Sequence, residues 1–174
     1  MKYFILTEDR RYTYPMFDGW HGILDSKTME MKKNQGIPRH LVYCVDGHMQ
    51  MVFADILLFP CFMVSGVVRD VICLYEPSIR YRRVVLMDRR QKKSKAYYVP
   101  FLEETDCVVD KSFKFGEKGS RDPIKLDGKK INGKALVKLS YRNSKRIAVS
   151  LDLIESILRR KTVGIGAEEA VVVD

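Results

Sequence analysis

Three histidines are the first residues to test for chemistry, since histidine supplies many general bases and metal ligands near neutral pH. They are His21, His40 and His48, and no two of them stand in an H-x-x-x-H or H-x-H arrangement. Such spacing is what presents two ring nitrogens to one metal ion from a single helix or strand. The histidines therefore predict no metal site, and we interpret them as surface or capping residues.

Serine nucleophiles and paired carboxylates have equally little support. Ser65 and Ser150 lack the G-x-S-x-G elbow that exposes a nucleophilic oxygen above a sheet. Three acidic pairs are adjacent in sequence, so on a strand their two side chains point to opposite faces and do not cooperate as acid and base. These pairs are Glu8-Asp9, Glu103-Glu104 and Glu168-Glu169, and the spaced pair Asp106 and Asp110 has no histidine beside it. We expect no catalytic residue and predict that the protein is not an enzyme.

Cofactor motifs fail for similar reasons. Gly164-Ile165-Gly166 matches part of a dinucleotide fingerprint, but the βαβ unit that such a loop requires does not fit into the residues that follow. The cysteines are widely spaced and form no C-x-x-C pair, which argues against zinc, and their apolar neighbours predict free, buried thiols in a reducing compartment. They are Cys44, Cys61, Cys73 and Cys107. We expect neither a cofactor nor a metal.

Composition describes an ordinary globular protein. Of the 174 residues, 46% are hydrophobic and 30% are charged. The longest apolar run, residues 56 to 64, is about half the length of a membrane span and contains Pro60. Residues 7 to 11 are polar and end the short apolar start of the chain before a signal sequence can form. We therefore expect a cytoplasmic protein with no membrane association.

Charge is the strongest functional signal in the sequence. The formal net charge is +9, and the stretch from Ser78 to Lys95 holds eight basic residues and one acidic residue. A basic stretch of this kind predicts a partner-binding surface, whereas the competing interpretation is a solvated hairpin whose lysines discourage edge pairing. The predicted partner-binding residues are Arg80, Arg82, Arg83, Arg89, Arg90, Lys92, Lys93 and Lys95.

The basic stretch belongs to a structural unit that occurs twice in the sequence. In both copies an apolar segment ends in a serine, an amphipathic helical pattern follows, and a valine-rich strand comes next. Ser65 starts the first copy and Ser150 the second, and we expect each hydroxyl to cap its helix. The strands are expected at residues 79 to 88 and 165 to 173, and the first of them turns through residues 89 to 95 into a return strand.

The remaining elements complete an α+β fold, mainly antiparallel sheet with a few short helices. We expect strands at residues 2 to 6 and 41 to 45, and a second hairpin that turns through residues 127 to 133. The whole chain, residues 1 to 174, is predicted to be a single domain with an N-terminal lobe (1 to 115) and a C-terminal lobe (116 to 174). The aromatic loop at residues 12 to 20 is either a lid on the core or a binding surface.

A set of short motifs runs from about residue 50 to residue 174. They are Asp55, Val64-Ser65, Val68, Val71, Tyr97-Tyr98-Val99, Asp106 to Asp110, Ser112, Ile131-Asn132-Gly133, Leu136 to Leu139, Val149-Ser150 and Val163-Gly164-Ile165. In these positions the chain resembles a family of bacterial immunity proteins from polymorphic toxin systems, first catalogued as a domain of unknown function. The resemblance implies a small cytosolic protein without catalysis that binds a cognate toxin tightly. The basic charge implies that this toxin is acidic or is not a nuclease, because inhibitors of basic nucleases are expected to be acidic.

The alternative is nucleic-acid binding through the basic hairpin at residues 78 to 95. Its arginines would contact phosphates, and Tyr81, Tyr97 and Tyr98 would stack on bases. Strand alternation divides these basic and aromatic groups between two faces, and no known nucleic-acid-binding motif accompanies them. We therefore rank this alternative second.

Overall fold

Two β-sheets and three short helices make up the part of the chain that the computed structural model describes, residues 1–24, 40–46, 50–109, 123–141 and 144–173. The six-stranded sheet has the order β7 (Glu104–Thr105), β9 (Leu136–Tyr141), β10 (Ser144–Ser150), β1 (Tyr3–Glu8), β11 (Ile165–Val173), β8 (Lys125–Asp127). The five-stranded sheet has the order β2 (His40–Val45), β5 (Tyr81–Asp88), β6 (Lys93–Pro100), β4 (Met63–Ser65), β3 (Ile56–Leu57). The helices are α2 (Gly66–Tyr75), α3 (Gly128–Ile131) and α4 (Leu151–Leu158).

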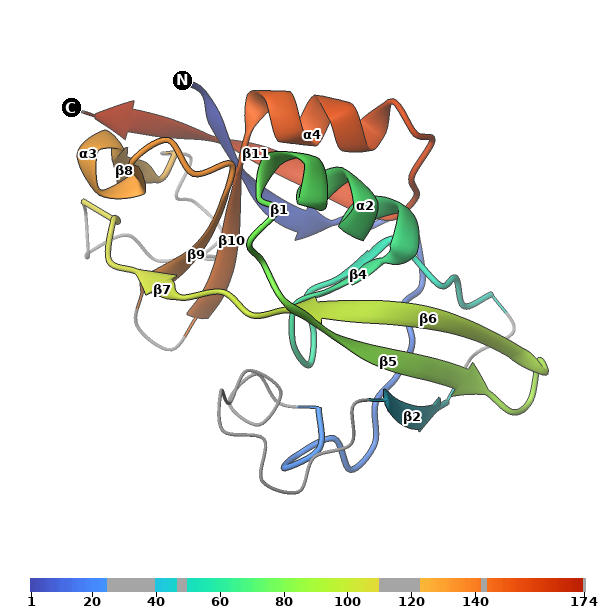
Figure 1. Ribbon diagram of the computed structural model, residues 1–174. Coiled ribbons are helices and arrows are strands. Elements are labelled where there is room, and N and C mark those ends of the chain that lie inside the picture. The colour runs from blue at the N-terminus through green and yellow to red at the C-terminus, as the bar shows by residue number, and fades with distance from the viewer. Residues whose placement is uncertain (25–39, 47–49, 110–122, 142–143, 174) are drawn as a thin grey trace.

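The predicted α+β class is confirmed. Strand pairs in the interior of both sheets are antiparallel, and the described parallel pairs, β7–β9, β11–β8 and β2–β5, lie at sheet edges. Helices α2 and α4 lie side by side and cover the region where the two sheets meet (Figure 1). Their buried residues share one apolar cluster with strands from both sheets, including Leu6, Val64 and Val149.

Both serines cap their helices as predicted. Ser65 Oγ accepts a hydrogen bond from Val68 N at 3.5 Å, and Ser150 Oγ accepts one from Leu153 N at 3.3 Å. Each serine has extended backbone angles and is buried. The two helices therefore start in the same way, because a buried helix start must satisfy its free amide groups within the protein.

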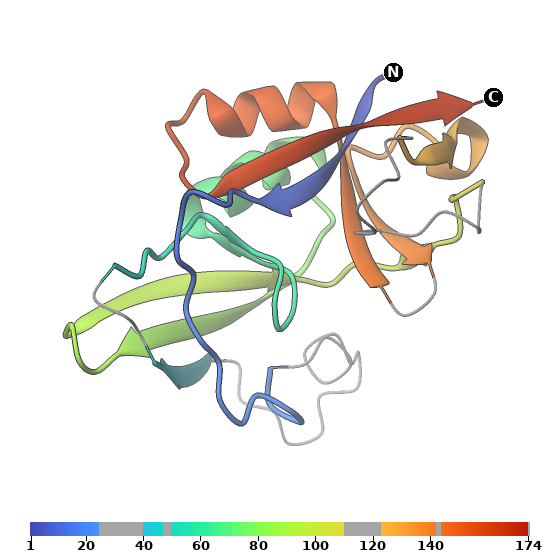
Figure 2. The same ribbon diagram turned by 180° about the vertical axis from the view of Figure 1, so that it is seen from behind.

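The duplication extends further than the sequence shows, because β1 completes the second unit. In the first unit, β6 pairs with β4 on one side and with β5 on the other. In the second unit, β1 takes the same place between β10 and β11 (Figure 2). Strand β1 is thus the counterpart of β6, although it lies at the opposite end of the sequence from its partners.

Two tyrosines confirm this equivalence at the level of single hydrogen bonds. Tyr97 is paired with Ser65 and donates its hydroxyl to Ala54 O at 2.7 Å. Tyr3 is paired with Ser150 and donates its hydroxyl to Lys134 O at 2.8 Å. Each serine amide donates to the carbonyl one residue further along, Asp55 O or Ala135 O, at 2.9 Å in both cases.

Substituting the two cap serines gives a matched test of the duplication. We predict that Ser150→Ala lowers the free energy of unfolding by about 1 kcal/mol, the usual value of a lost cap. Ser65→Ala is predicted to cost about 2 kcal/mol, since the Ser65 hydroxyl also donates to the Asp55 carboxylate. Urea unfolding measures both, with the exposed Ser94→Ala as a control of negligible effect. Equal losses at Ser65 and Ser150 contradict the extra bond.

The second predicted hairpin is wrong. Strand β8 pairs with β11, and β9 pairs with β10, so the segments on either side of residues 127 to 133 are not neighbours. Asp127 instead caps α3 by accepting from Lys129 N and Lys130 N, and Asn132 ends that helix in the left-handed region. An Asp-Gly pair starts a one-turn helix here because the carboxylate satisfies the first amide groups.

Two smaller differences concern the lobes and the cysteines. The strands do not separate at residue 115, since β1 and β7 precede that position and belong to the sheet of the second half. All four cysteines are free thiols, but Cys44 is exposed because β2 turns that side chain outward. The predicted lobe boundary, between residues 115 and 116, lies outside the described residues.

The aromatic loop acts as a lid. Phe17 is buried in the apolar cluster beneath the five-stranded sheet, and Tyr14 and Trp20 pack against the same cluster. The Trp20 ring lies edge-on to Phe59 with the ring centroids 5.0 Å apart. These rings remove from water the face of the sheet that α2 does not cover.

Candidate protein-binding surface

The basic stretch forms the β5–β6 hairpin, which extends beyond the two helices (Figure 1). Its turn is held by Asp88, whose Oδ1 accepts from Arg90 N at 2.9 Å and from Gln91 N at 3.2 Å. Lys92 takes a positive φ of 53° to close the turn. Asp88 itself is buried, and the pairing of β5 with β2 and β6 continues as far as Asp88, so the start of the turn is held in the sheet.

Asp88→Ala is predicted to destabilise the fold by about 1 to 2 kcal/mol, because two turn amides lose their acceptor. Asp88→Asn keeps one acceptor oxygen in place and is expected to retain most of the stability. Urea unfolding of both variants measures the difference. If the two variants lose the same amount, the turn hydrogen bonds are not the cause.

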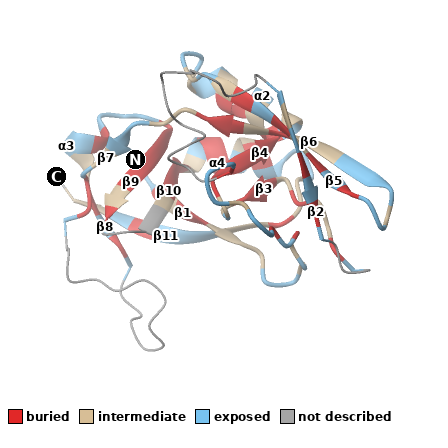
Figure 3. Cartoon of the chain, turned by 90° about the horizontal axis from the view of Figure 1, so that it is seen from below, coloured by how far each residue is buried: buried red, intermediate tan, exposed pale blue. Residues whose placement is uncertain are grey.

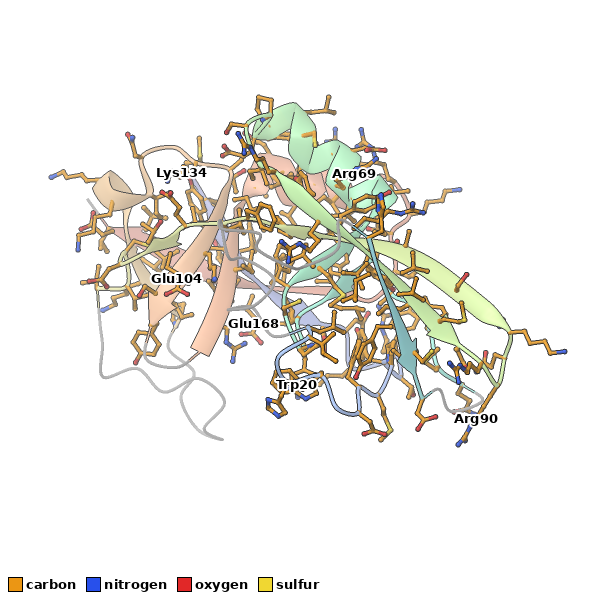
Figure 4. The ribbon with its side chains drawn as sticks, turned by 60° about the horizontal axis from the view of Figure 1, so that its bottom comes forward. Trp20, Arg69, Arg90, Glu104, Lys134 and Glu168 are labelled. Carbon is orange, nitrogen blue, oxygen red and sulfur yellow. The ribbon has the colours of Figure 1, made fainter. Side chains whose placement is uncertain are left out.

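Four of the eight predicted residues lie exposed at the turn of this hairpin, and we call them the tip cations. They are Arg89, Arg90, Lys92 and Lys93. Arg83 is also exposed, but it lies near the start of β5, where it is paired with Tyr98. Figure 4 shows Arg90 at the end of the hairpin, beside the end of β2. Its contact with Asp46 is 3.8 Å long and joins two exposed side chains, so it holds the arginine only weakly. Burial colouring shows the same end of the hairpin as largely exposed (Figure 3).

Arg82 was predicted to be part of the partner-binding surface, but this prediction is wrong because the residue is buried. Its side chain is on the core face of β5 with Val84 and Leu86, and only 4% of the residue is exposed. The guanidinium carbon lies 5.6 Å from the centre of the Phe101 ring. Burial lowers the pKa of this guanidinium. Arg82 is buried because every second side chain of β5 faces the core.

Lys95 is likewise not available to a partner protein, because it forms an ion pair within the chain. Lys95 Nζ lies 2.9 Å from Asp55 Oδ1 and donates to Phe53 O at 2.9 Å. The other carboxylate oxygen of Asp55 accepts from Val163 N, and Asp55 N donates to Val163 O, both at 2.8 Å. Asp55 therefore connects the hairpin to the loop between α4 and β11.

Asp55 was not among the residues predicted to be functional, and its structural role follows from its electrostatics. Burial by itself raises the pKa of the Asp55 carboxyl, but hydrogen bonds from Lys95, Val163 and Ser65 outweigh that effect. The pKa is lowered below its usual value of 3.8, and the carboxylate is charged at neutral pH. In the sequence, the feature that could have indicated this structural role is a single aspartate directly before an apolar strand.

Arg80 lies at the other end of β5 from the tip cations. It is exposed and lines a cleft between the two repeated units. The structure therefore brings four of the predicted residues together and places the other four elsewhere: Arg82 is buried, Lys95 is held in an ion pair with Asp55, and Arg80 and Arg83 are exposed near the start of β5.

Beside the tip cations is an apolar strip on the sheet face beyond α2. Val42 is 59% exposed and Met87 is 38% exposed, and Met87 is paired with the exposed Cys44. On the same face, helix α2 reaches only as far as Tyr98, whose ring lies 4.0 Å from the guanidinium carbon of Arg69. An apolar centre with a charged rim is the usual composition of a protein-binding surface.

The aromatic residues that a nucleic-acid site requires are not on this surface. Tyr97 is fully buried, Tyr98 is covered by Arg69, and Tyr81 packs against the central core. Burial raises the pKa of both Tyr81 and Tyr97, as expected for hydroxyls removed from water. The hairpin can contact phosphates through its cations, but these three tyrosines offer it no stacking platform.

Histidine, cysteine and acidic side chains are the groups that could hold a metal ion or act in catalysis. Within the described ranges, no three histidine, cysteine or acidic side chains are grouped in a way that could hold a metal ion. His21 stacks on Trp20 with ring centroids 3.8 Å apart, and His40 is exposed on β2. His48 and Asp110 lie outside the described residues. No described helix has both the length and the apolar character needed to cross a bilayer.

No protein-family model matches the chain, and a search of curated proteins finds no match. The residues and geometry of the tip surface therefore carry the functional proposal.

Proposed function

We propose that this protein is a non-catalytic immunity protein of the bacterial cytoplasm, which neutralises a cognate toxin by tight association. The observation that carries the proposal is the tip surface, where four exposed cations lie beside an apolar strip on a hairpin whose turn is held by Asp88. A surface that is rigid before binding loses little conformational entropy on association, which favours tight complexes.

Charge identifies the chemistry of the partner. The tip cations attract an acidic surface and repel a basic one, and repulsion between like charges at an interface costs several kcal/mol. Nucleases that grip phosphates are typically basic. The proposed toxin is therefore acidic, or it acts on something other than nucleic acid.

Co-expression tests the proposal directly. The protein encoded next to this chain in the genome is expressed in a bacterial host with and without it. We expect growth to be arrested by the neighbour alone and restored when both are present, with the two proteins eluting together in size-exclusion chromatography. A neighbour that arrests growth equally in both strains, or that never co-elutes, contradicts the proposal.

Nucleic-acid binding is the second candidate, and the exposed tip cations are the observation that favours it. It requires retention of random RNA or DNA in filter binding at low salt, with retention lost steeply as salt rises. Absence of retention at low salt excludes this candidate and leaves the immunity proposal standing.

A further inference from the structure

A cleft of about 550 Å³ opens between the two repeated units, at the end of β5 opposite the hairpin tip. Three segments line it: residues 76 to 80 between α2 and β5, residues 101 to 105 after β6, and residues 134 to 137 at the start of β9. Figure 4 shows Lys134 at the opposite end of the molecule from Arg90. The cleft is therefore separate from the tip surface, and its volume is within the range of ligand sites.

The second repeated unit shows what occupies the equivalent place there. The pair Tyr81–Pro100 of the first unit corresponds to the pair Ala167–Leu6 of the second. Three residues further along each strand, Ser78 is therefore the counterpart of Gly164, and Glu103 is the counterpart of Asp9. The Tyr14 hydroxyl lies 3.0 Å from both Asp9 O and Gly164 O, and its position closes the space.

Close packing makes the second unit solid at this point. A Cβ on Gly164 would lie 2.4 Å from the Ala54 Cβ and 3.3 Å from the Tyr14 hydroxyl, and φ of this glycine is +78°. The β1–β11 ladder also continues through the pairs Thr7–Gly166 and Glu8–Ile165. In the first unit the ladder ends at Tyr81–Pro100, followed by a single bond from Phe101 N to Arg80 O.

The two units differ at Glu76. Asp55 of the first unit and Ala135 of the second are counterparts, and the amide of each bonds across to the other unit. Asp55 N donates directly to the backbone carbonyl of Val163. Ala135 N donates to the side-chain Oε1 of Glu76 at 2.6 Å. A carboxylate at the end of a side chain thus takes the place of a backbone carbonyl beside the open cleft.

We propose that this cleft binds a tyrosine side chain carried on an extended segment of a partner protein. The apolar residues Ile79, Leu102 and Leu136 line the pocket and suit the ring. The carbonyls of Ser78 and Glu103 correspond to those that receive the Tyr14 hydroxyl in the second unit. Arg80 and Lys134 line two of the walls, and cations complement the negative faces of an aromatic ring. This site is independent of the tip surface and of the identity of the proposed toxin.

The test uses the blocked peptide acetyl-Thr-Tyr-Pro-Met-amide, which copies residues 13 to 16, added to the ¹⁵N-labelled full-length protein. Titration extends to about 10 mM, because one buried aromatic side chain supports only weak affinity. We expect amide shifts along the three segments that line the cleft and none at residues 89 to 92. Replacing the peptide tyrosine by alanine is expected to raise Kd at least about tenfold, and replacing it by phenylalanine about two- to tenfold.

Two protein variants provide matched controls. Arg80→Ser with Lys134→Ser is expected to weaken binding by about threefold or more. Lys92→Asn with Lys93→Ser removes the same charge at the tip and is expected to leave binding unchanged, with asparagine at the position of positive φ. Shifts that are absent from the cleft at the highest peptide concentration overturn the proposal, and so do equal shifts from the alanine peptide. The peptide series on the unmodified protein decides the question if a variant fails to fold.

Discussion

Asp55→Ala is expected to lower the free energy of unfolding by about 3 kcal/mol, the largest stability loss that we predict. The substitution removes the partner of Lys95 and the acceptor of Val163 N, and it leaves a partly buried ammonium group without its counter-charge. It also detaches the hairpin from the loop between α4 and β11. Urea unfolding monitored by circular dichroism measures the loss.

The double variant Asp55→Ala with Lys95→Met separates the two causes. Methionine keeps the apolar length of lysine and removes its charge, so about half of the lost stability should return. If the double variant is as unstable as Asp55→Ala, the lost contact with Val163 dominates over the unpaired charge. If Asp55→Ala itself unfolds at the same urea concentration as the unmodified protein, the proposed connection through Asp55 is wrong.

The same carboxylate predicts a pH dependence with a definite sign. Its pKa in the folded protein lies below the usual value of 3.8, so the ionised form favours folding. The contribution is fully present above pH 3.8 and is lost as the pH falls through the lowered pKa. The stability difference between the unmodified protein and Asp55→Asn should therefore be constant near neutral pH and shrink in acid. A difference that grows in acid contradicts this assignment.

Removing four tip cations is expected to slow association with an acidic partner by about 10- to 100-fold at low salt. The variant combines Arg89→Ser, Arg90→Ser, Lys92→Asn and Lys93→Ser, with asparagine at the position of positive φ because it tolerates that conformation. Steering depends on charges near the contact, so the dependence of the on-rate on salt should fall as well. Stopped-flow mixing with the purified toxin at several salt concentrations measures both effects.

A variant with the same net charge controls for the location of the effect. Four exposed lysines at the other end of the molecule are replaced by serine: Lys2, Lys125, Lys129 and Lys130. This control should change the on-rate by less than about threefold, since it lies beyond the screening length from the tip. If both variants slow association equally, net charge and not the hairpin is responsible, and the tip surface loses its support as the interface.

Much of the local structure could be predicted from the sequence. The serines at positions 65 and 150 predicted two capped helices, and valine-rich runs predicted β5 and β11. Even the alternation on β5, with Arg82 on one face and Arg83 on the other, follows from the period of a strand. These features depend on residues within a few positions of one another, and the sequence displays them directly.

The candidate site could be predicted only in part. The sequence located a basic stretch, but a count of charges does not show which side chains reach solvent. Arg82 and Lys95 turn inward because one is on the core face of a strand and the other finds Asp55, forty residues away in sequence. The cleft was not predicted at all, since its three walls come together only when both repeated units are in place.

By itself, the sequence determined the two serine-started units and their basic hairpin, because capping, periodicity and turn formation are settled between near neighbours. Tertiary structure alone decided that β1 joins β10 and β11, which cations remain exposed, and that one unit is closed by Tyr14 while the other stays open. The physical reason is that sheet pairing and burial depend on which distant segments meet. An apolar strand such as β1 offers the same hydrogen-bonding groups to any edge, and only the complete core selects among the edges available.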